Sequence, residues 1–519
     1  MISYDSKFWP KDTCNTRDFD NAGTSKFITG MTPVKIAQWS LPGVLLFASS
    51  CQQKPEEVFP ERPNIILIIA DDMNWDDCGA YGHPHIRTPN IDRLADNGIK
   101  FTNAFLTTSS CSPSRASIIT GMYPHQTDAE QLHWPVPADK ITFVELLGDA
   151  GYWTAQAGKW HLGDAMTGRF DFIASEKAFR DAAGEEKLDL PAADGSGCHL
   201  WTPTLNQRPD DRPFFLWLAA LDPHRPYYEN IIPEPHDPSD ALIPPYMPDD
   251  PIVRKDFALY YDEISRMDSY IGQVIGELEK QGVTENTLIL FISDNGRPFP
   301  RDKTTMYDGG IKTPFILQWP AAVSPGTVTP SMVSAVDIAP TLLKLAGVPS
   351  PDNFSGTDFS ALLLDPATEI RDYIFAQAHW HDMERMYRAV RDSRFKYIRN
   401  FYPDLPNTPP ADALYSMTFH KMVELKEEGR LTADQKNVFI SPTPEEELYD
   451  LDNDPFELNN LAGDPGFAAE LERMRTVLKE FMDSTDDVIP EVRTPDEFDR
   501  ATGAPLPNRQ WPRPGKFER

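Results

Sequence analysis

The chain has 519 residues, of which 40% are hydrophobic and 25% charged, and its formal net charge is −30. The length exceeds one typical hydrophobic core, so we expect a large domain with a smaller one. The negative charge argues against a nucleic-acid partner, although a local basic pocket could still bind an anionic substrate. The five cysteines show no zinc-type spacing and are too few for a disulfide framework. Cys78 and Cys198 could form a bridge, but we expect two buried free thiols.

The N-terminal segment has the pattern of an export signal. After Met31, a lysine and a short apolar run lead to the letters ASSC, which end at Cys51. This pattern resembles a bacterial lipoprotein signal, and the apolar run is too short to span a bilayer. We expect an exported protein, periplasmic or anchored by lipid at the bacterial outer membrane or cell surface, with a plain secretory signal as the alternative. Residues 1–30 then form a non-native upstream extension, and 31–51 the signal peptide and lipobox.

Residues 62–367 alternate between apolar runs and amphipathic segments. Continuous apolar runs typical of buried parallel strands occur in three places: 64–72, 212–227 and 286–296. Helical patterns occupy 88–101, with a stop at Gly98, then 257–282, 333–347 and the start of 141–163, which continues as a strand and a loop. This alternation predicts a large α/β domain whose mainly parallel sheet is flanked by helices.

After about residue 368 the pattern changes. Residues 385–400 alternate as exposed antiparallel strands do, and 445–465 suggest a strand, an acidic turn and a helix start. A helix is predicted at 467–484. We therefore expect a C-terminal α+β subdomain over 368–485, with a small antiparallel sheet and one packed helix. The proline-rich tail, 486–519, is expected to wrap the surface or stay loose.

Reactive residues follow each predicted strand of the first domain. Binding sites in open α/β sheets form outside the carboxyl ends of the strands, so these residues are expected to converge. Three carboxylates and an amide among them form a set of hard oxygen ligands, which suits Ca²⁺ or Mg²⁺ and poorly suits zinc. The residues at the strand ends are Asp71, Asp72, Lys159, His161, Asp222, His224, Asp294 and Asn295.

The segment SSCSPSRASIITG, 109–121, places Cys111 at the start of an apolar helical run. The N-terminus of a helix favours negative charge, and Arg115 follows one turn later on the same side. This arrangement favours a nucleophile directed at an anion. A Cys–His hydrolase is the alternative, but it gives no reason for the oxygen-rich metal ligands.

Together these motifs resemble the type I sulfatases of the alkaline phosphatase superfamily. The letters CSPSR match their C-x-P-x-R signature, whose cysteine is oxidised to formylglycine (3-oxoalanine) by a formylglycine-generating enzyme. The resemblance extends over about residues 62–480 and implies an alkaline phosphatase-like fold. The other matching motifs are GMYPH (121–125), GKWHLG (158–163), DPHRPY (222–227), DNG (294–296), KTTMYDGGIKTP (303–314) and ELYDLDNDP (447–455).

The resemblance also implies a role for each residue of the site. Ca²⁺, with Mg²⁺ as the alternative, would be bound by Asp71, Asp72, Asp294, Asn295 and the modified Cys111. Arg115, Lys159 and Lys303 would hold the sulfate oxygens, and Lys303 is preferred to Lys312 because it precedes Tyr307 by four residues. His224 would protonate the leaving group, and His161 would assist sulfate release. The hydrated aldehyde offers one hydroxyl that attacks sulfur and a second that expels sulfate.

The stretch DNGRPFPRDKTTMYDGG, 294–310, is similar to the heparan N-sulfatase (sulfamidase) branch, with Lys303 where that branch carries arginine. We favour hydrolysis of an O-sulfate ester on a carbohydrate. The alternatives are N-sulfoglucosamine sulfohydrolase activity, phosphonate monoester hydrolysis, and a glycan-binding lipoprotein with a decayed site, which the intact Cys111 disfavours. Candidate substrate-binding residues are His85, His133, Arg225, Arg297, His379 and His381.

Overall fold

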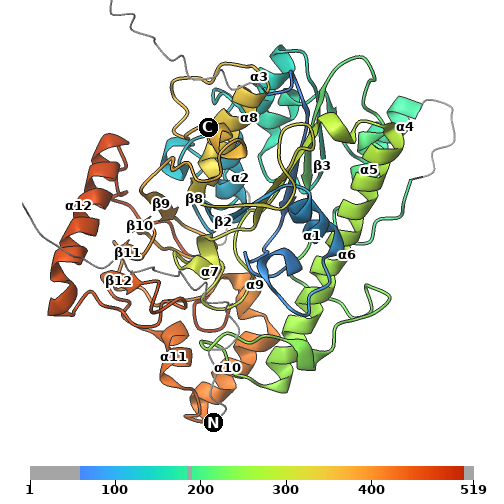
Figure 1. Cartoon of the computed structure of the whole chain (residues 1–519). Helices are drawn as coiled ribbons and strands as arrows, with labels where there is room; N and C mark the ends of the chain where they lie inside the picture. The colour runs from blue at the N-terminus through green and yellow to red at the C-terminus, as the bar shows by residue number, and fades with distance from the viewer. Residues whose placement is uncertain (1–58, 184–189, 508–519) are drawn as a thin grey trace, which may run out of the picture. The chain divides into compact units, whose positions relative to one another are not determined.

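The apolar runs of the first domain pair into one eight-stranded sheet in the computed structural model, which describes residues 59–183 and 190–507 (Figure 1). The strand order is β4-β3-β5-β1-β6-β7-β2-β8, and within the described residues only β7 runs antiparallel to its neighbours. The prediction of a mainly parallel sheet is therefore confirmed. The strands are β1 (Asn64–Ala70), β2 (Ile99–Phe105), β3 (Trp153–Gly158), β4 (Phe172–Ile173), β5 (Phe214–Ala219), β6 (Thr287–Ser293), β7 (Phe315–Gln318) and β8 (Thr327–Ser334).

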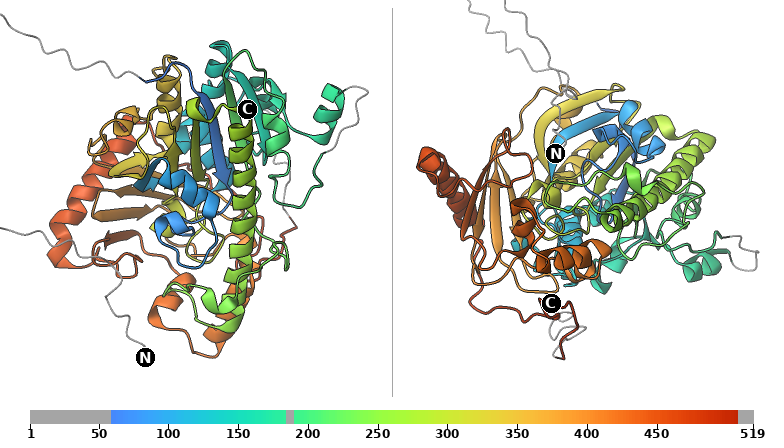
Figure 2. Two further views of the ribbon diagram at one scale, coloured as in Figure 1. Left: turned by 45° about the vertical axis from the view of Figure 1, so that its right-hand side comes forward. Right: turned by 90° about the horizontal axis from the view of Figure 1, so that it is seen from below.

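Helices cover both faces of this sheet because both faces of its strands are apolar. Along β1, Ile65 and Leu67 face the core that includes α2, α3 and α8, whereas Ile66 and Ile68 face the core that includes α1 and α6. The long helix α6 follows one side of the sheet in Figure 2. The helices of this domain are α1 (Pro89–Asp96), α2 (Cys111–Thr120), α3 (Phe143–Asp149), α4 (Glu176–Ala183), α5 (Trp201–Leu205), α6 (Pro251–Gln281), α7 (Asp308–Ile311) and α8 (Ile338–Leu345).

One predicted helix boundary agrees with the structure and one differs. The first helix was expected to stop at Gly98, and α1 ends at Asp96; Gly98 then approaches β7 so closely that a Cβ would lie 2.3 Å from the Leu317 carbonyl oxygen. Helix α6 starts six residues before the predicted position, because Asp250 caps it by accepting a hydrogen bond from the Ile252 amide (2.9 Å).

The C-terminal part forms a four-stranded antiparallel sheet in the order β12-β11-β10-β9. One face packs on α12 and the other packs on the first domain around Phe105 and Ile311 (Figure 2). The strands at 385–400 were expected to be exposed, which is wrong: both of their faces are covered, and most of their residues are buried. The elements are β9 (Ile374–Ala378), β10 (Tyr387–Arg391), β11 (Phe395–Asn400), α9 (Ala411–Leu414), α10 (Met417–Glu427), α11 (Ala433–Lys436), β12 (Glu446–Asp450) and α12 (Ala468–Ser484).

The described part of the tail, 486–507, packs on the protein. Its Asp487 is completely buried and forms a bidentate ion pair with Arg388 of β10, with Nε–Oδ2 and Nη2–Oδ1 distances of 2.5 and 2.7 Å. Further along, the Trp380 indole donates a hydrogen bond to the Pro495 carbonyl (3.1 Å). These contacts match the expectation that the tail wraps the surface.

We expect Arg388→Ala to lower the free energy of unfolding by about 3–5 kcal/mol, because the substitution leaves the Asp487 carboxylate buried without its partner. The matched control is Arg493→Ala, which removes an equally bidentate pair with Asp404 whose side chains are 43% and 62% exposed. That loss should stay below about 1 kcal/mol. Urea unfolding of both variants measures the difference, and equal losses would contradict the packing of the tail described above.

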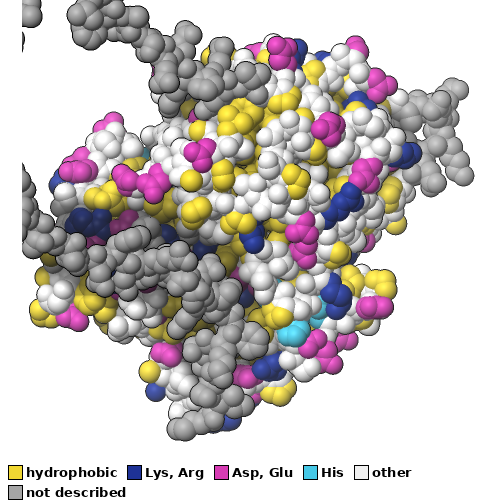
Figure 3. All heavy atoms as spheres, viewed as in Figure 1, with side chains coloured by type: hydrophobic (Ala, Val, Ile, Leu, Met, Phe, Trp, Pro, Cys, Tyr) yellow, Lys and Arg dark blue, Asp and Glu magenta, His cyan; other side chains and the backbone are white. Residues whose placement is uncertain are grey.

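Cys78 and Cys198 are buried free thiols, as expected. The predicted signal peptide and lipobox lie outside the described residues. Within the described residues no helix combines the length and apolarity needed to cross a membrane. Asp and Glu side chains are spread over the face in Figure 3 rather than gathered in one patch.

Candidate active site

The site forms where β1 and β6 end side by side. These strands are parallel neighbours in register from Asn64↔Thr287 to Ala70↔Ser293, so the residues that follow them meet at one edge of the sheet. Asp71 and Asp72 follow β1, and Asp294 and Asn295 follow β6. All four residues are buried. Asp72 has a φ of 73°, a strained backbone conformation of the kind that accumulates at functional sites.

Helix α2 brings Cys111 to these carboxylates. The Sγ atom lies 3.9 Å from Asp72 Oδ1, and one ligand atom each of Asp71, Asp72, Cys111 and Asp294 lie within 4.8 Å of one another. We call these four residues the Cys111 cluster. Burial raises the pKa of the Cys111 thiol well above its ordinary value. One turn along the helix, the buried guanidinium of Arg115 donates from Nε to Asp294 Oδ2 (2.8 Å).

The Cys111 cluster has the donors that a hard divalent cation needs. Asp71 Oδ1 and Asn295 Oδ1 are buried without a hydrogen-bond partner, although such atoms are normally paired. Burial and the nearby Asp71 carboxylate raise the pKa of Asp294 to about 6 against the effect of Arg115. A cation bound among these oxygens would satisfy the unpaired atoms and relieve the repulsion, so the residues fit Ca²⁺ or Mg²⁺.

Two lysines flank the Cys111 cluster. Lys159, which follows β3, forms an ion pair with Asp71, and Lys303 lies with Nζ 2.7 Å from Asp72 Oδ2. Burial would raise the pKa of Asp71, but Lys159 and the other nearby positive groups outweigh it and hold this pKa below the ordinary value. With Arg115, the lysines supply three positive charges at one place in an acidic protein. Such a pocket can bind an anion.

The two predicted proton-transfer histidines differ in their surroundings. His224 Nδ1 lies 2.5 Å from the Arg225 carbonyl oxygen, which can only accept, so Nδ1 carries a proton and Nε2 faces Asp72. His161 Nε2 lies 2.6 Å from His133 Nδ1. Burial, Lys159 and His133 lower the pKa of His161 well below its usual value. Burial and these neighbours thus favour the neutral form of His161.

Sequence reasoning missed one residue of the site, Asp412 of α9. Its Oδ2 lies 2.7 Å from Lys303 Nζ and 3.6 Å from His224 Nε2. Burial would raise the pKa of Asp412, but Lys303 and His224 hold it below the ordinary value. The sequence around Asp412 contains no motif that indicates a functional residue. The position of Asp412 at the site is therefore apparent only from the folded structure.

Of the predicted substrate-binding residues, the structure brings His133 and His381 to the site. His133 contacts His161, and His381 Nδ1 lies 2.7 Å from the hydroxyl of Ser110, the residue before Cys111. The segment 379–385 contacts the first domain through His381 and through Arg385, whose Nη1 donates to the Thr304 carbonyl (2.9 Å).

The other four predicted substrate-binding residues have different partners. Arg225 donates to both oxygens of Asp256 and to the Pro298 carbonyl. Arg297 forms ion pairs with Asp76, Asp77 and Asp302. His379 is buried beside Gln377, and His85 lies beside Asp240 with 41% of its side chain exposed. Arg225 and Arg297 are thus held by other side chains and His379 is buried, and the role of these residues in substrate binding stays a prediction.

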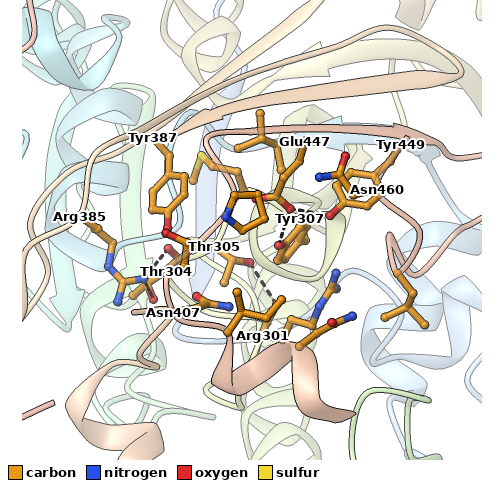
Figure 4. Close-up of a pocket in the computed structure, with 17 residues that line it drawn as sticks. Arg301, Thr304, Thr305, Tyr307, Arg385, Tyr387, Asn407, Glu447, Tyr449 and Asn460 are labelled. Atoms are coloured by element: carbon orange, nitrogen blue, oxygen red, sulfur yellow. Dashed lines mark hydrogen bonds between the residues drawn. The ribbon is translucent and has the colours of Figure 1, made fainter. Parts of the chain in front are cut away.

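A cavity of about 90 Å³ lies behind the loop that carries Lys303 (Figure 4). Arg301, Thr304 and Tyr307 line it from the loop, and Glu447 accepts a hydrogen bond from the Tyr307 hydroxyl (2.8 Å). No residue of the Cys111 cluster lines this cavity. It is therefore a separate feature of the described chain.

Comparisons with known proteins agree with this geometry. A family model described as Sulfatase matches residues 63–348, and one described as N-sulphoglucosamine sulphohydrolase, C-terminal, matches 299–409. The chain is 32% identical over 499 residues to an ulvan-active sulfatase of Formosa agariphila, covering 84% of this chain and 79% of that protein. It is 32% identical over 491 residues to N-sulphoglucosamine sulphohydrolase of Homo sapiens, covering 87% and 94%.

A solved structure of a protein in complex with D-glucosamine-2-N,6-O-disulfate has the same fold. Its TM-score is 0.63 at 24% identity, over 83% of this chain and 99% of that one. The mainly parallel sheet with its flanking helices is thus the fold that this chain shares with that solved structure. The chain belongs to the sulfatase family, and it is a sulfuric ester hydrolase.

Proposed function

We propose that the protein hydrolyses sulfate groups, preferably O-sulfate esters, on a sulfated carbohydrate, with formylglycine formed from Cys111 and with Ca²⁺ as the favoured cation. The observation that carries the proposal is the Cys111 cluster, a buried cysteine with three carboxylates, together with the three positive side chains that contact it. The printed names of the relatives support the substrate class, since one is ulvan-active and another is a sulphohydrolase of N-sulphoglucosamine.

In this proposal each group of the chain has one task. The cation would act as a Lewis acid, held by Asp71, Asp72, Asp294 and Asn295. Residue 111, once converted, supplies an aldehyde whose hydrate is the nucleophile. Arg115, Lys159 and Lys303 neutralise the sulfate oxygens.

The two histidines handle protons. His224, protonated on both ring nitrogens, delivers its Nε2 proton to the oxygen that leaves with the sugar, and His161 accepts a proton when sulfate is released.

Sulfamidase activity is the second candidate, favoured by the C-terminal family match at 299–409 and by the human relative. A panel of O-sulfated saccharides, an N-sulfated glucosamine and phosphonate esters separates the candidates by which of these substrates is hydrolysed. We expect turnover of the O-sulfates. Turnover of the N-sulfate alone would assign a sulfamidase, and turnover of phosphonate alone would overturn the substrate class.

We expect Ca²⁺ at a hundredfold excess over its Kd to raise the free energy of unfolding by about 2.7 kcal/mol, because the cation binds carboxylates that repel one another only in the folded protein. Thermal unfolding with and without chelator measures this. Asp71→Asn should abolish the shift, whereas Asp404→Asn, at an exposed position, should retain it. Absence of any shift in the wild type with either Ca²⁺ or Mg²⁺ would contradict the metal assignment.

We further infer that the protein is exported and anchored by lipid at Cys51, on the basis of the letters ASSC after a short apolar run. In a bacterial host, Cys51→Ala should shift the protein from the membrane fraction to the soluble fraction. A variant that stays in the membrane fraction would contradict the lipid anchor.

A further inference from the structure

We infer that Asp412 determines specificity: its carboxylate selects substrates that carry a hydroxyl or amine next to the scissile sulfate and rejects those that carry a second sulfate there. The inference rests on the proposed function. It concerns a residue of the C-terminal region, contributed by α9 (Ala411–Leu414), rather than a residue of the sequence motifs.

The first observation is the position of the Asp412 carboxylate. Its Oδ2 lies 2.7 Å from Lys303 Nζ, which is proposed to hold sulfate, and 3.6 Å from Nε2 of His224, which is proposed to protonate the leaving oxygen. The Asp412 carboxylate, which contacts both side chains, would therefore lie beside the bond that joins the sulfate to the sugar. The ring atoms next to that bond would be bound close to this carboxylate.

The second observation is a gradient of exposure. The side chains of Asp72 and Lys303 are 0% and 1% exposed, whereas those of Asp412 and His224 are 18% and 32% exposed. The sulfate group would therefore lie at the buried end, and the sugar would extend toward solvent past Asp412 and His224. Asp412 thus faces the sugar and not the sulfur.

The third observation is that Asp412 is held in place by other contacts. Its Oδ1 accepts a hydrogen bond from the Ala413 amide (2.7 Å), and the Ala411 amide donates to Asp382 Oδ2 (3.0 Å). Asp412 Oδ2 forms an ion pair with Lys303 at 2.7 Å, the same distance that separates Lys303 Nζ from Asp72. A fixed second carboxylate at the mouth of an anion pocket weakens the affinity of that pocket for every anion. Selection among substrates is a function that would account for its presence there.

The chemistry of a carboxylate fixes what it can select. An ionised carboxylate only accepts hydrogen bonds, so its partner on the sugar must be a donor such as a hydroxyl or an amine. A second sulfate on the adjacent carbon would offer only acceptors and a like charge, which is strongly unfavourable at close range. A site built around one polar partner discriminates sharply against an analogue that lacks this partner.

The test compares kcat/KM for methyl glucosides that carry one sulfate at each ring position in turn with matched disulfates whose second sulfate is on the adjacent carbon. The wild type should prefer the best monosulfate by roughly a hundredfold. Asp412→Asn should reduce this preference at least about tenfold, and Asp412→Glu should keep most of it. Asp404→Asn, an exposed residue of the same segment, is the charge-matched control and should leave the preference unchanged.

Equal losses of both substrates in Asp412→Asn would overturn the inference, because Asp412 would then only position Lys303 and His224. A wild type without preference for the monosulfates would overturn it as well. Failure of the wild type to release sulfate from any compound would instead overturn the proposed function on which the inference depends. Thermal unfolding of each variant distinguishes a lost fold from lost selectivity.

Discussion

Cys111→Ala is expected to reduce sulfate release by roughly ten-thousand-fold, to the level that binding and charge neutralisation alone can support. The substitution removes the side chain from which the nucleophile is formed. It leaves the three carboxylates of the Cys111 cluster and the neighbouring positive side chains in place. Since Cys111 lies at the start of α2 and alanine favours helix, the variant should fold normally. Sulfate release under substrate saturation, with thermal unfolding as the check on folding, measures the effect.

The control for this prediction is the wild-type sequence produced in a host without the maturing enzyme. That protein should retain the thiol and be almost as inactive as Cys111→Ala, because burial raises the pKa of the thiol and leaves it protonated. Substantial turnover by Cys111→Ala would show that the reaction does not pass through residue 111.

The second large effect is expected from His224→Ala, and it should depend on the leaving group. For a sulfated sugar, whose alcohol is a poor leaving group, kcat should fall by roughly a hundredfold to ten-thousand-fold, because Nε2 no longer delivers a proton. For 4-nitrophenyl sulfate, whose phenolate leaves without a proton, the loss should be less than about tenfold. Steady-state kinetics on both substrates measures the difference.

His161→Ala is the matched comparison, since this histidine is proposed to act after the leaving group has departed. It should reduce turnover of both substrates by similar factors where sulfate release limits the rate. If His224→Ala instead slowed both substrates equally, and His161→Ala only the sugar sulfate, the two roles would have to be exchanged.

The sequence was sufficient to predict the centre of the large sheet, because β1, β5 and β6 are continuous apolar runs. The strands β2, β7 and β8 were not predicted, since β2 and β8 contain polar residues and β7 has only four residues. The residues after β1 and β6 could be predicted to meet, because parallel neighbours end at one edge of a sheet. Helical periodicity also predicted correctly that Cys111 begins a helix and that Arg115 follows one turn later. Local sequence patterns were thus enough to predict where these strands end and where Cys111 lies.

The sequence could not predict contacts that depend on how distant segments pack. The strands at 385–400 alternate in polarity, which suggested exposure, yet the polar side chains of this sheet form buried ion pairs such as that of Arg388 with Asp487. Arg225 follows His224 in the motif DPHRPY, but its guanidinium donates two hydrogen bonds to Asp256 of α6, a contact that the motif does not indicate. Asp412 reaches the site from a segment without any motif.

The role of formylglycine is tested most directly by plotting the rate of sulfate release from a sulfated saccharide against the fraction of formylglycine at residue 111. Peptide mass spectrometry on preparations with graded conversion measures that fraction. We expect a rate proportional to it, with almost no turnover by the unconverted protein. Equal rates at all conversions, or no sulfate release by fully converted protein that contains Ca²⁺, would contradict this role.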